Sequence, residues 1–507
     1  MRSSVTFSLL PLLFFTYESS AVQLTIQRPP KATDVNNNLI NKQNERYTAN
    51  ITISGVGKRD SNVPSTWRLN PISSGQRRPR HGQYRFMGIQ SFNDTGLNAT
   101  LRYGDGSDYV SGDIGVGKFE LGTSYSIPFQ AFLNVDDASD AEQPDFDQGI
   151  FGLWGLGFNT PGSSGINDEV QETYGSTATW GQSVLANIFA QNASGADYIG
   201  ISLSRTGDQE GTADASLTIS EYDSNYQAVQ NSPKVLQVPA NSGAWSVTLD
   251  GFSIGGKKIN WPSTLDVAPT GKNIIILDTG TTNILMPGEQ VAVCTFLQYK
   301  KSKLMVDTIK AIYSSIPGAV LSPNSLIPPT QFSETDDVWV VPCNATPQVV
   351  ATFGGKDYPI HPLDVTDMQV VTSPDGRRNY TVCIGAFTDV GSIVDGEADA
   401  LFGDSFMRNV YTVFDFGTGG NSNSTPFVQM LSQTDATKSA SDLVSVRTQS
   451  MANMPPEIAP IDLVKIFNGS EASGNTGAPA QGSATPFFTP PMALIGVISL
   501  LAVTSFF

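Results

Sequence analysis

Histidine is nearly absent from this sequence. Its 507 residues include two histidines, His81 and His361. Hydrolytic sites that pair a serine with a histidine, and most zinc sites, depend on histidine side chains. The scarcity leaves such sites little to draw on, and we expect neither a metal ion nor any other cofactor.

Positive charge is also in short supply. Lys and Arg total 30 against 47 Asp and Glu, which gives a formal net charge of -17 at pH 7. Nucleic acids and anionic membrane surfaces repel such a chain, so we expect no nucleic-acid partner. The acidic balance suits work at low pH, where repulsion between carboxylates fades. A surface that merely promotes solubility is the alternative explanation.

The two ends of the chain have the composition of processing signals. Residues 1–21 contain Arg2, an apolar run and then Ser19-Ser20-Ala21, which is typical of a secretory signal peptide. Residues 491–507 contain the apolar run MALIGVISLLAVTSFF, which is short for a membrane span and has no basic residue after it. We therefore expect the mature protein to leave the cytosol.

The segment before the apolar tail predicts a lipid anchor. A spacer rich in Ser, Gly, Ala and Thr begins at Asn468, and this order of spacer and tail matches a GPI-attachment signal. We expect attachment within residues 468–477, which would place the protein on the extracellular face of the plasma membrane or in the cell wall. A tail-end membrane helix, an ordinary buried segment and a fully secreted protein remain as alternatives.

The secretory route gives meaning to the cysteines and to the glycosylation sequons. Three cysteines, Cys294, Cys343 and Cys383, allow one disulfide and leave one thiol. Cys294 lies in VAVCTFL, which has the pattern of the buried face of a helix, so we predict that Cys343 pairs with Cys383. Eight Asn-X-Ser/Thr sequons predict N-glycosylation. Their asparagines are Asn50, Asn93, Asn98, Asn192, Asn344, Asn379, Asn423 and Asn468.

Short strand-like segments, separated by Gly, Pro and Asn-Ser turns, fill residues 47–432. Helical spacing occurs in Thr179 to Gln191 and in Gly288 to Gln298. These patterns predict an all-β fold of two related lobes, residues 47–220 and 221–432, with a cleft between them. A repeated β unit with one carboxylate loop per copy would place two acids face to face.

The remaining parts of the chain flank these lobes. Residues 22–46 form an N-terminal extension. Residues 433–490 are rich in Ser, Ala, Thr, Gly and Pro, which bury too little apolar surface to become ordered, so we expect a flexible stalk. Within it, Pro460 to Phe467 is a candidate docked strand, and the hydrophobic tail at 491–507 follows.

The clearest chemical signal is the segment IIILDTGTTNILMP at residues 274–287. Four apolar residues precede Asp278, and a glycine and hydroxyl side chains follow it. A buried strand that delivers an aspartate into a tight glycine turn fixes the carboxylate by hydrogen bonds. A second Asp-Thr-Gly begins at Asp94, but it lies in a sequon and no apolar strand precedes it. We interpret that copy as a turn.

Several ordered motifs resemble those of the pepsin-like aspartic proteases. Residues 102–107, RYGDGS, followed by SGDIGVGKFELG, are similar to the flap hairpin of that family. Residues 245–256 resemble the strand pair that leads to its second aspartate, and residues 402–415 resemble its closing C-terminal segment. Cys343 and Cys383 match its C-lobe disulfide loop.

The resemblance implies roles for individual residues. Asp278 corresponds to a catalytic aspartate. Residues implied to bind substrate are Tyr103, Gly104, Asp105, Gly280, Thr281 and Thr282. The implied fold is the bilobal acid-protease fold.

The signal, lobes, stalk and tail together resemble the GPI-anchored yapsin-type fungal members of that family. The implied protein is a monomeric aspartic-type endopeptidase that hydrolyses protein or peptide substrates at acidic pH. Family members use two aspartates that share one proton, because two carboxylates about 3 Å apart cannot both ionise at low cost. The ionised aspartate takes a proton from water, and the protonated one polarises the scissile carbonyl.

The first aspartate loop of the family has no clear counterpart. Asp60 is the positional candidate, because it precedes Trp67 by seven residues and Trp67 precedes Tyr103 by thirty-six, intervals that resemble the family's. However, Gly57-Lys58-Arg59 stands where the apolar strand belongs, and Ser61-Asn62 stands where Thr-Gly belongs. An error in the sequence or a recent loss of the loop would explain this departure.

Two other functions compete with the protease. A catalytically inactive relative would bind peptides, glycans or proteins at the cell surface through the same cleft. A structural wall mannoprotein is the third hypothesis, and it leaves the flap and Asp278 without a role.

Overall fold

A computed structural model of the chain describes two isolated strands and most of the chain between residues 92 and 472. The described stretches are 22–26, 51–55, 92–103, 106, 108–121, 125–139, 153–159, 165–191, 196–203, 205, 215–259, 261–263, 265–287, 308–322, 338–389, 396–417 and 425–472.

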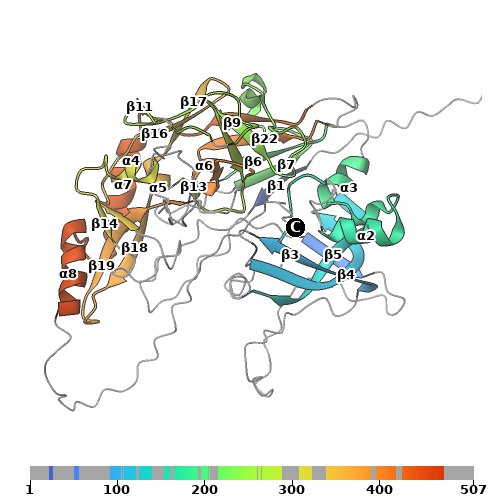
Figure 1. The fold of residues 1–507 in the computed structure, drawn as a ribbon, viewed down its shortest axis with the longest axis horizontal. Helices are drawn as coiled ribbons and strands as arrows, with labels where there is room; N and C mark the ends of the chain where they lie inside the picture. The colour runs from blue at the N-terminus through green and yellow to red at the C-terminus, as the bar shows by residue number, and fades with distance from the viewer. Residues whose placement is uncertain are drawn as a thin grey trace, which may run out of the picture.

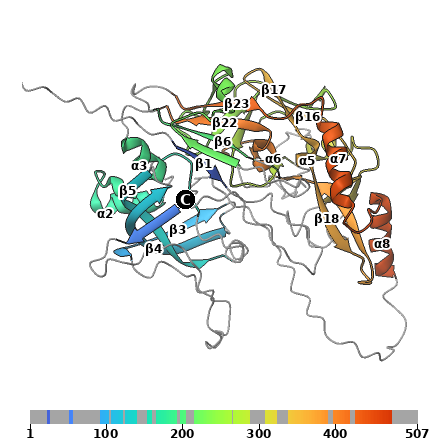
Figure 2. The same ribbon diagram turned by 180° about the vertical axis from the view of Figure 1, so that it is seen from behind.

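One antiparallel sheet of six strands joins the two halves of the sequence. Its order is β1-β7-β6-β22-β23-β8, and Figures 1 and 2 show it between the outer parts of the two halves. The strands are β1 (Val22–Ile26), β7 (Ala215–Ile219), β6 (Tyr198–Ser202), β22 (Val410–Asp415), β23 (Phe427–Ser432) and β8 (Val235–Leu236). Strand β6 pairs with β22, although more than 200 residues separate them in sequence. The predicted halves are therefore bound by shared backbone hydrogen bonds.

The N-terminal half contributes its own sheet of four strands, with three helical segments against it. The sheet contains β2 (Ile51–Gly55), β3 (Asn93–Tyr103), β4 (Asp108–Leu121) and β5 (Tyr125–Ala138). The helical segments are α2 (Gly165–Tyr174), the 3-10 turn η2 (Thr179–Gly181) and α3 (Val184–Gln191). Figure 1 shows α2 and α3 beside this sheet. Phe119 and Leu185 are buried where β4 and α3 contribute to the main core.

The C-terminal half builds three smaller sheets. The first has the order β11-β10-β16-β17, with β11 (Lys257–Lys258), β10 (Gly251–Ile254), β16 (Val349–Phe353) and β17 (Lys356–Ile360). The second has the order β20-β13-β21-β12-β9, with β20 (Phe387–Asp389), β13 (Ile284–Met286), β21 (Ala400–Phe402), β12 (Asn273–Leu277) and β9 (Ser246–Leu249). The third has the order β14-β15-β19-β18, with β14 (Val320–Ser322), β15 (Val338–Val341), β19 (Asn379–Gly385) and β18 (Thr366–Thr372).

Short helical segments connect these sheets. They are η3 (Gln227–Asn231), α4 (Thr308–Tyr313), α5 (Pro362–Val365) and α6 (Asp404–Met407). The mostly β architecture with few short helices confirms the predicted fold class. The helix predicted over Thr179 to Gln191 is present as η2 followed by α3, whereas Gly288 to Gln298 lies outside the described residues.

The segment predicted to be a flexible stalk begins instead with two packed helices. These are α7 (Ser439–Met451) and α8 (Pro460–Ala472), and the second replaces the docked strand predicted at Pro460 to Phe467. In α8, Leu463 and Phe467 pack with Val340, Val382 and Ile384 on the third sheet. Composition suggested disorder because apolar residues are few in this segment, but Leu443, Leu463 and Phe467 are buried. Residues 473–490 of the predicted stalk lie outside the described residues.

The segment that links α7 to α8 is fixed by polar contacts. The Thr381 hydroxyl donates to the Pro455 carbonyl at 2.6 Å, and the Cys343 amide donates to Glu457 Oε1 at 2.9 Å. Arg447 of α7 is buried and donates to the Thr366 carbonyl at 2.8 Å.

No helix among the described residues is long and apolar enough to cross a membrane. The tail at 491–507 lies outside them.

Candidate active site

Strand β12 delivers Asp278 into the interior of the C-terminal half. All five residues of β12 are buried, which follows from its position between β21, to which it is parallel, and β9, to which it is antiparallel. The Asp278 amide continues this pairing by donating to the Phe402 carbonyl at 3.1 Å. The apolar run that marks this strand in the sequence is thus an interior strand of its sheet, with a neighbour on each side.

The Asp278 carboxyl group is almost completely buried and accepts two hydrogen bonds. The Gly280 amide donates to Oδ1 and the Thr281 hydroxyl donates to Oδ2, each at 2.8 Å. Its exposed fraction is 4%. Burial raises the pKa of Asp278 to about 6, although the two hydrogen bonds act in the opposite direction. This carboxyl group therefore exchanges a proton in the mildly acidic range, as an acid–base catalyst requires.

A small, mostly apolar cavity of about 20 Å³ adjoins Asp278. It has room for about one water molecule. Its walls come from Leu156 in the N-terminal half, from the shared sheet and from the neighbouring strands of the second sheet. The lining residues are Leu156, Ile199, Ile201, Trp245, Leu277, Asp278, Thr279 and Phe414. These apolar neighbours account for the raised pKa, and no sequence pattern had marked Leu156, Ile199 or Ile201 as neighbours of the aspartate.

The loop after Asp278 rests on the start of α6. Gly403 donates its amide to the Asn283 carbonyl at 3.0 Å, and Asp404 donates to the Thr281 carbonyl at 2.7 Å. A Cβ atom at Gly403 would lie 2.0 Å from the Thr281 carbonyl oxygen, so only glycine allows this approach. The amide and hydroxyl of Ser405 donate to the Thr282 carbonyl at 3.0 and 2.9 Å. Gly280 and Thr281 are buried and Thr282 is half-buried.

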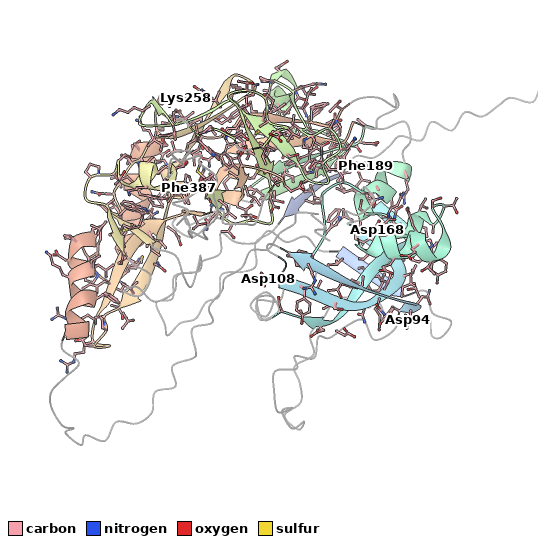
Figure 3. All side chains as sticks on the ribbon, viewed as in Figure 1. Asp94, Asp108, Asp168, Phe189, Lys258 and Phe387 are labelled. Atoms are coloured by element: carbon pink, nitrogen blue, oxygen red, sulfur yellow. A yellow bond between two sulfur atoms is a disulfide. The ribbon has the colours of Figure 1, made fainter. Side chains whose placement is uncertain are left out.

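The predicted flap hairpin is present. Tyr103, at the end of β3, pairs with Asp108, the first residue of β4, and the Gly106 amide donates to the Tyr103 carbonyl at 2.9 Å. Tyr103 is half-buried. In Figure 3, Asp108 marks the end of this hairpin that is nearer the C-terminal half. Gly104 and Asp105 lie outside the described residues.

The second Asp-Thr-Gly, at Asp94, occupies a different environment. It forms a bulge within β3, where the Gly96 backbone has a φ of 74° and the Gly96 amide donates to Asp94 Oδ1 at 2.8 Å. Asp94 is exposed and lies at the outer end of the hairpin, far from Phe387 of the second sheet (Figure 3). The predicted turn is therefore a bend inside a strand, and this aspartate is not part of the site.

Comparison with known protein families agrees with the geometry around Asp278. The model of the family described as eukaryotic aspartyl protease matches residues 64–422. The chain belongs to the eukaryotic aspartyl protease family. The match contains Asp278, the flap hairpin and the α6 segment, and it ends before α7 and α8. The fold is thereby established as pepsin-like.

Individual relatives are distant. Over 382 residues the chain is 23% identical to the aspartic-type endopeptidase ctsD of Aspergillus fumigatus, with 73% of this chain and 63% of that protein aligned. It is 22% identical over 377 residues to the probable aspartic-type endopeptidase CTSD of Arthroderma benhamiae, with 73% of this chain and 59% of that protein aligned. The chain thus spans less than two thirds of the length of these fungal relatives.

A mammalian relative and a solved structure extend the comparison. The chain is 22% identical over 370 residues to cathepsin E of Oryctolagus cuniculus, with 70% of this chain and 72% of that protein aligned. The crystal structure of an aspartic proteinase from Irpex lacteus aligns at 18% identity with a TM-score of 0.46, covering 70% of this chain and 87% of that one.

The candidate for the family's first aspartate, the partner of Asp278, lies outside the described residues. This candidate is Asp60, and Trp67 and the basic residues around them lie outside as well. The family match begins at residue 64, four residues after Asp60. Asp60 stays a prediction based on its spacing.

The disulfide between Cys343 and Cys383 is present, with the two Cα atoms 5.1 Å apart. It joins Cys343, next to the end of β15, to Cys383 of β19, and the strands are paired where Val341 faces Cys383. Cys294 lies outside the described residues. Two strands already held side by side by backbone hydrogen bonds are thus covalently joined.

Four of the eight sequon asparagines have described side chains. Asn98, Asn344 and Asn379 are exposed and Asn93 is half-buried, while the side chains of the other four sequon asparagines lie outside the description. Their glycosylation stays a prediction. Within the described stretches, no three His, Cys, Asp or Glu side chains are grouped to hold a metal ion. Buried His361 accepts a hydrogen bond from the Leu363 amide through Nδ1, which is a helix-capping role.

Proposed function

We propose that this chain is a cell-surface aspartic-type endopeptidase that hydrolyses peptide bonds at acidic pH. The observation that carries the proposal is the buried Asp278 carboxyl group. It is held by the Gly280 amide and the Thr281 hydroxyl, and burial raises its pKa to about 6. Family membership supplies the reaction type, and this geometry supplies an acid group suited to it.

The proposed reaction uses Asp278 and a second carboxylate on either side of one water molecule. The pair would hold one proton, because the first ionisation raises the cost of the second. The ionised carboxylate would take a proton from the water, and the protonated one would polarise the substrate carbonyl. Asp60 is the proposed partner, on its spacing from Trp67 and Tyr103. The flap hairpin at Tyr103 would cover the bound peptide.

An inactive peptide-binding protein is the second candidate function, and the sequence around Asp60 favours it. Lys58 and Arg59 precede Asp60 and Ser61-Asn62 follow it, so the sequence there lacks the apolar run and the Thr-Gly pair that flank Asp278. Adjacent cations also favour the charged form of Asp60 over a shared proton. Without a second carboxylate, the cleft would bind peptides and not cleave them.

One experiment separates these two functions. The full chain, expressed through a secretory host, would be assayed for cleavage of a mixed peptide library between pH 3 and pH 6. A protease requires that Asp278→Asn abolish cleavage, that a statine-type inhibitor block it, and that Asp94→Asn leave it unchanged. Asp94 supplies the matched control because it also begins an Asp-Thr-Gly. If the unmodified chain binds the inhibitor without cleaving any peptide, the binding protein is the correct function.

A separate substitution tests whether Asp60 is the partner carboxylate of Asp278. In the protease, Asp60→Asn should reduce the rate as severely as Asp278→Asn, because either carboxylate alone cannot share a proton. Retention of full activity by Asp60→Asn would show that another carboxylate serves as the partner.

The proposed location rests on the two ends of the sequence. Residues 1–21 would direct secretion, and the segment after an attachment residue within 468–477 would be exchanged for a lipid anchor. The expected result is release of the protein from intact cells by a phosphatidylinositol-specific phospholipase. Retention after that treatment would favour a membrane helix, and recovery in the medium without treatment would favour plain secretion.

A further inference from the structure

A buried group of ions lies at the far end of α6 from the Asp278 loop. Asp364 of α5 accepts from Arg205 Nε through Oδ2 and from Arg408 Nε through Oδ1, each at 2.7 Å. The Asp364 side chain is 2% exposed and the Arg408 side chain 5%. Burial alone would raise the pKa of Asp364, but the two guanidinium groups hold it below its usual value. The carboxylate therefore stays charged inside the protein.

Asn409 adds a second connection between Asp364 and α6. Its side-chain amide nitrogen donates to Asp364 Oδ2 at 3.0 Å and to the Ser405 carbonyl at 2.8 Å. Its side-chain oxygen accepts from Arg205 Nη2 at 2.6 Å and from the Thr434 hydroxyl at 2.5 Å. Arg408 and Asn409 directly follow α6, so both residues at the end of this helix are fixed to one carboxylate.

The opposite end of the same helix holds the loop that carries the catalytic-type aspartate. Asp404 and Ser405, its first two residues, donate their amides to the carbonyls of Thr281 and Thr282. The Thr281 hydroxyl in turn donates to Asp278 Oδ2. Because α6 is a single turn of four residues, a shift of its last residue moves its first. Hydrogen bonds at both ends of α6, together with its covalent backbone, therefore connect Asp364 to Asp278.

We propose that Asp364 is a positioning residue for Asp278, acting through Arg408, Asn409 and α6. The proposal rests on the role of Asp278 in the proposed protease, but its test needs no activity. A purely stabilising role would not require this chemistry, since buried ion pairs are often replaced by apolar side chains without loss of stability. What an apolar cluster cannot supply is the fixed direction of two hydrogen bonds from one carboxylate to the residues that follow α6.

Arg205 approaches the same carboxylate from a different element. It follows β6, the strand that contributes Ile199 and Ile201 to the cavity wall, and it makes its ion pair with Oδ2. Replacing Arg205 leaves the contacts from Asp364 to Arg408 and Asn409 in place. Replacing Arg408 leaves Asp364 with Arg205. The two arginines thus provide matched variants that each leave one cation on Asp364.

The test compares Arg408→Met with Arg205→Met in the full chain by amide hydrogen exchange and mass spectrometry. We expect Arg408→Met to accelerate exchange about tenfold in peptides covering residues 278–284 and 403–408, because α6 is released. Arg205→Met should leave both peptides within about twofold of the unmodified chain. Equal acceleration in both variants, or none in either, would overturn the proposal.

Two further variants distinguish positioning from general stability. Arg408→Lys retains a cation within reach of Asp364 and should restore most of the protection. Asp364→Asn should release the loop as Arg408→Met does, whereas Asp223→Asn, a change at another carboxylate with 2% exposure, should not. If Asp364→Asn does not fold, the comparison of Arg408→Met with Arg205→Met still distinguishes positioning from general stability. If the chain cleaves peptides, Arg408→Met should lower kcat more than it raises KM. If the exchange test fails while the unmodified chain still cleaves peptides, the positioning role of Asp364 is refuted and the proposed protease function is not.

Discussion

The two Asp-Thr-Gly triplets of this chain show how little of the site is local. In both, the glycine amide donates to the aspartate Oδ1 at 2.8 Å. Asp94 nevertheless lies exposed in a strand bulge, while Asp278 has 4% of its surface exposed and a cavity beside it. The triplet sets the hydrogen bond, and the surroundings set the pKa of the acid.

The raised pKa of Asp278 predicts a specific dependence of stability on pH. Its folded-state pKa is about 6 and its ordinary value is 3.8, so between these values the folded protein holds a proton that the unfolded chain has released. Below pH 4 both states hold this proton, and Asp278 does not destabilise the folded state. As the pH rises past 6, ionisation of the buried carboxyl group lowers the free energy of unfolding by about 3 kcal/mol. Asp278→Asn should remove that loss.

The measurement is urea unfolding of both proteins at several pH values from 3.5 to 7. The difference in unfolding free energy between the unmodified chain and the Asp278→Asn variant should change by about 3 kcal/mol across this range. A constant difference would mean that the folded-state pKa of Asp278 is not raised.

Gly403 gives a second prediction at the scale of one residue. A Cβ atom there would meet the carbonyl oxygens of Thr281 and Asn283 at 2.0 and 2.4 Å. Gly403→Ala should therefore destabilise the protein by about 3 kcal/mol, because backbone atoms must move apart. Gly251→Ala is the control, since its Cβ would come no closer than 3.4 Å to the flexible Lys258 side chain. Similar midpoints in thermal unfolding for the two variants would contradict this account.

Among the elements, α7 and α8 are the least expected from the sequence. They lie in the segment that the sequence predicted to be a flexible stalk, and the family match ends before them, at residue 422. Yet Leu443 and Leu463 are fully buried, and Arg447 lies 3.1 Å from Cys383 Sγ through Nη1. These two helices are therefore an integral layer of the C-terminal half, covering the third sheet and its disulfide.

A pair of substitutions in α8 tests this attachment. Leu463 is fully buried, whereas Ile461 in the same helix is 50% exposed. Leu463→Ala should cost about 3 kcal/mol of unfolding free energy, and Ile461→Ala less than about 1 kcal/mol. Denaturant unfolding of both variants measures the difference. Equal, small effects would indicate that α8 does not contact the sheet.

At the scale of the whole molecule, the six-stranded sheet determines how the halves behave. Strand β6 of the N-terminal half pairs with β22 of the C-terminal half over five residue pairs. One core cluster also contains Leu185 and Phe402 from the two halves. Neither half can unfold fully without exposing backbone hydrogen-bonding groups and core side chains of the other half.

We therefore expect the halves to unfold in one cooperative transition. Calorimetry, circular dichroism and tryptophan fluorescence should give coincident midpoints. Gly200→Val should lower the midpoint for all probes together, because a Cβ at Gly200 would lie 2.1 Å from the Tyr411 hydroxyl on β22. Two separate transitions, with only one sensitive to Gly200→Val, would show that the halves are independent.

Sequence patterns predicted the parts of the site that depend on neighbours in the chain. The apolar run before Asp278 predicted a buried strand, and the flap segment at Tyr103 predicted a hairpin; both are present. The Cys343–Cys383 pair was also predicted correctly. Such features follow from side-chain periodicity and turn chemistry, which a single segment contains in full.

Only the tertiary structure decided the surroundings of that aspartate. Leu156, Ile201 and Phe414 come together at Asp278 from segments far apart in sequence, and Asp364 joins Arg408 across 44 residues. Burial and ion pairing depend on which segments meet, and no local pattern records that. The sequence by itself determined which residue is the acid and that its loop is buried. The fold determined its pKa, the helix that holds it and the packing of the residues that follow the lobes.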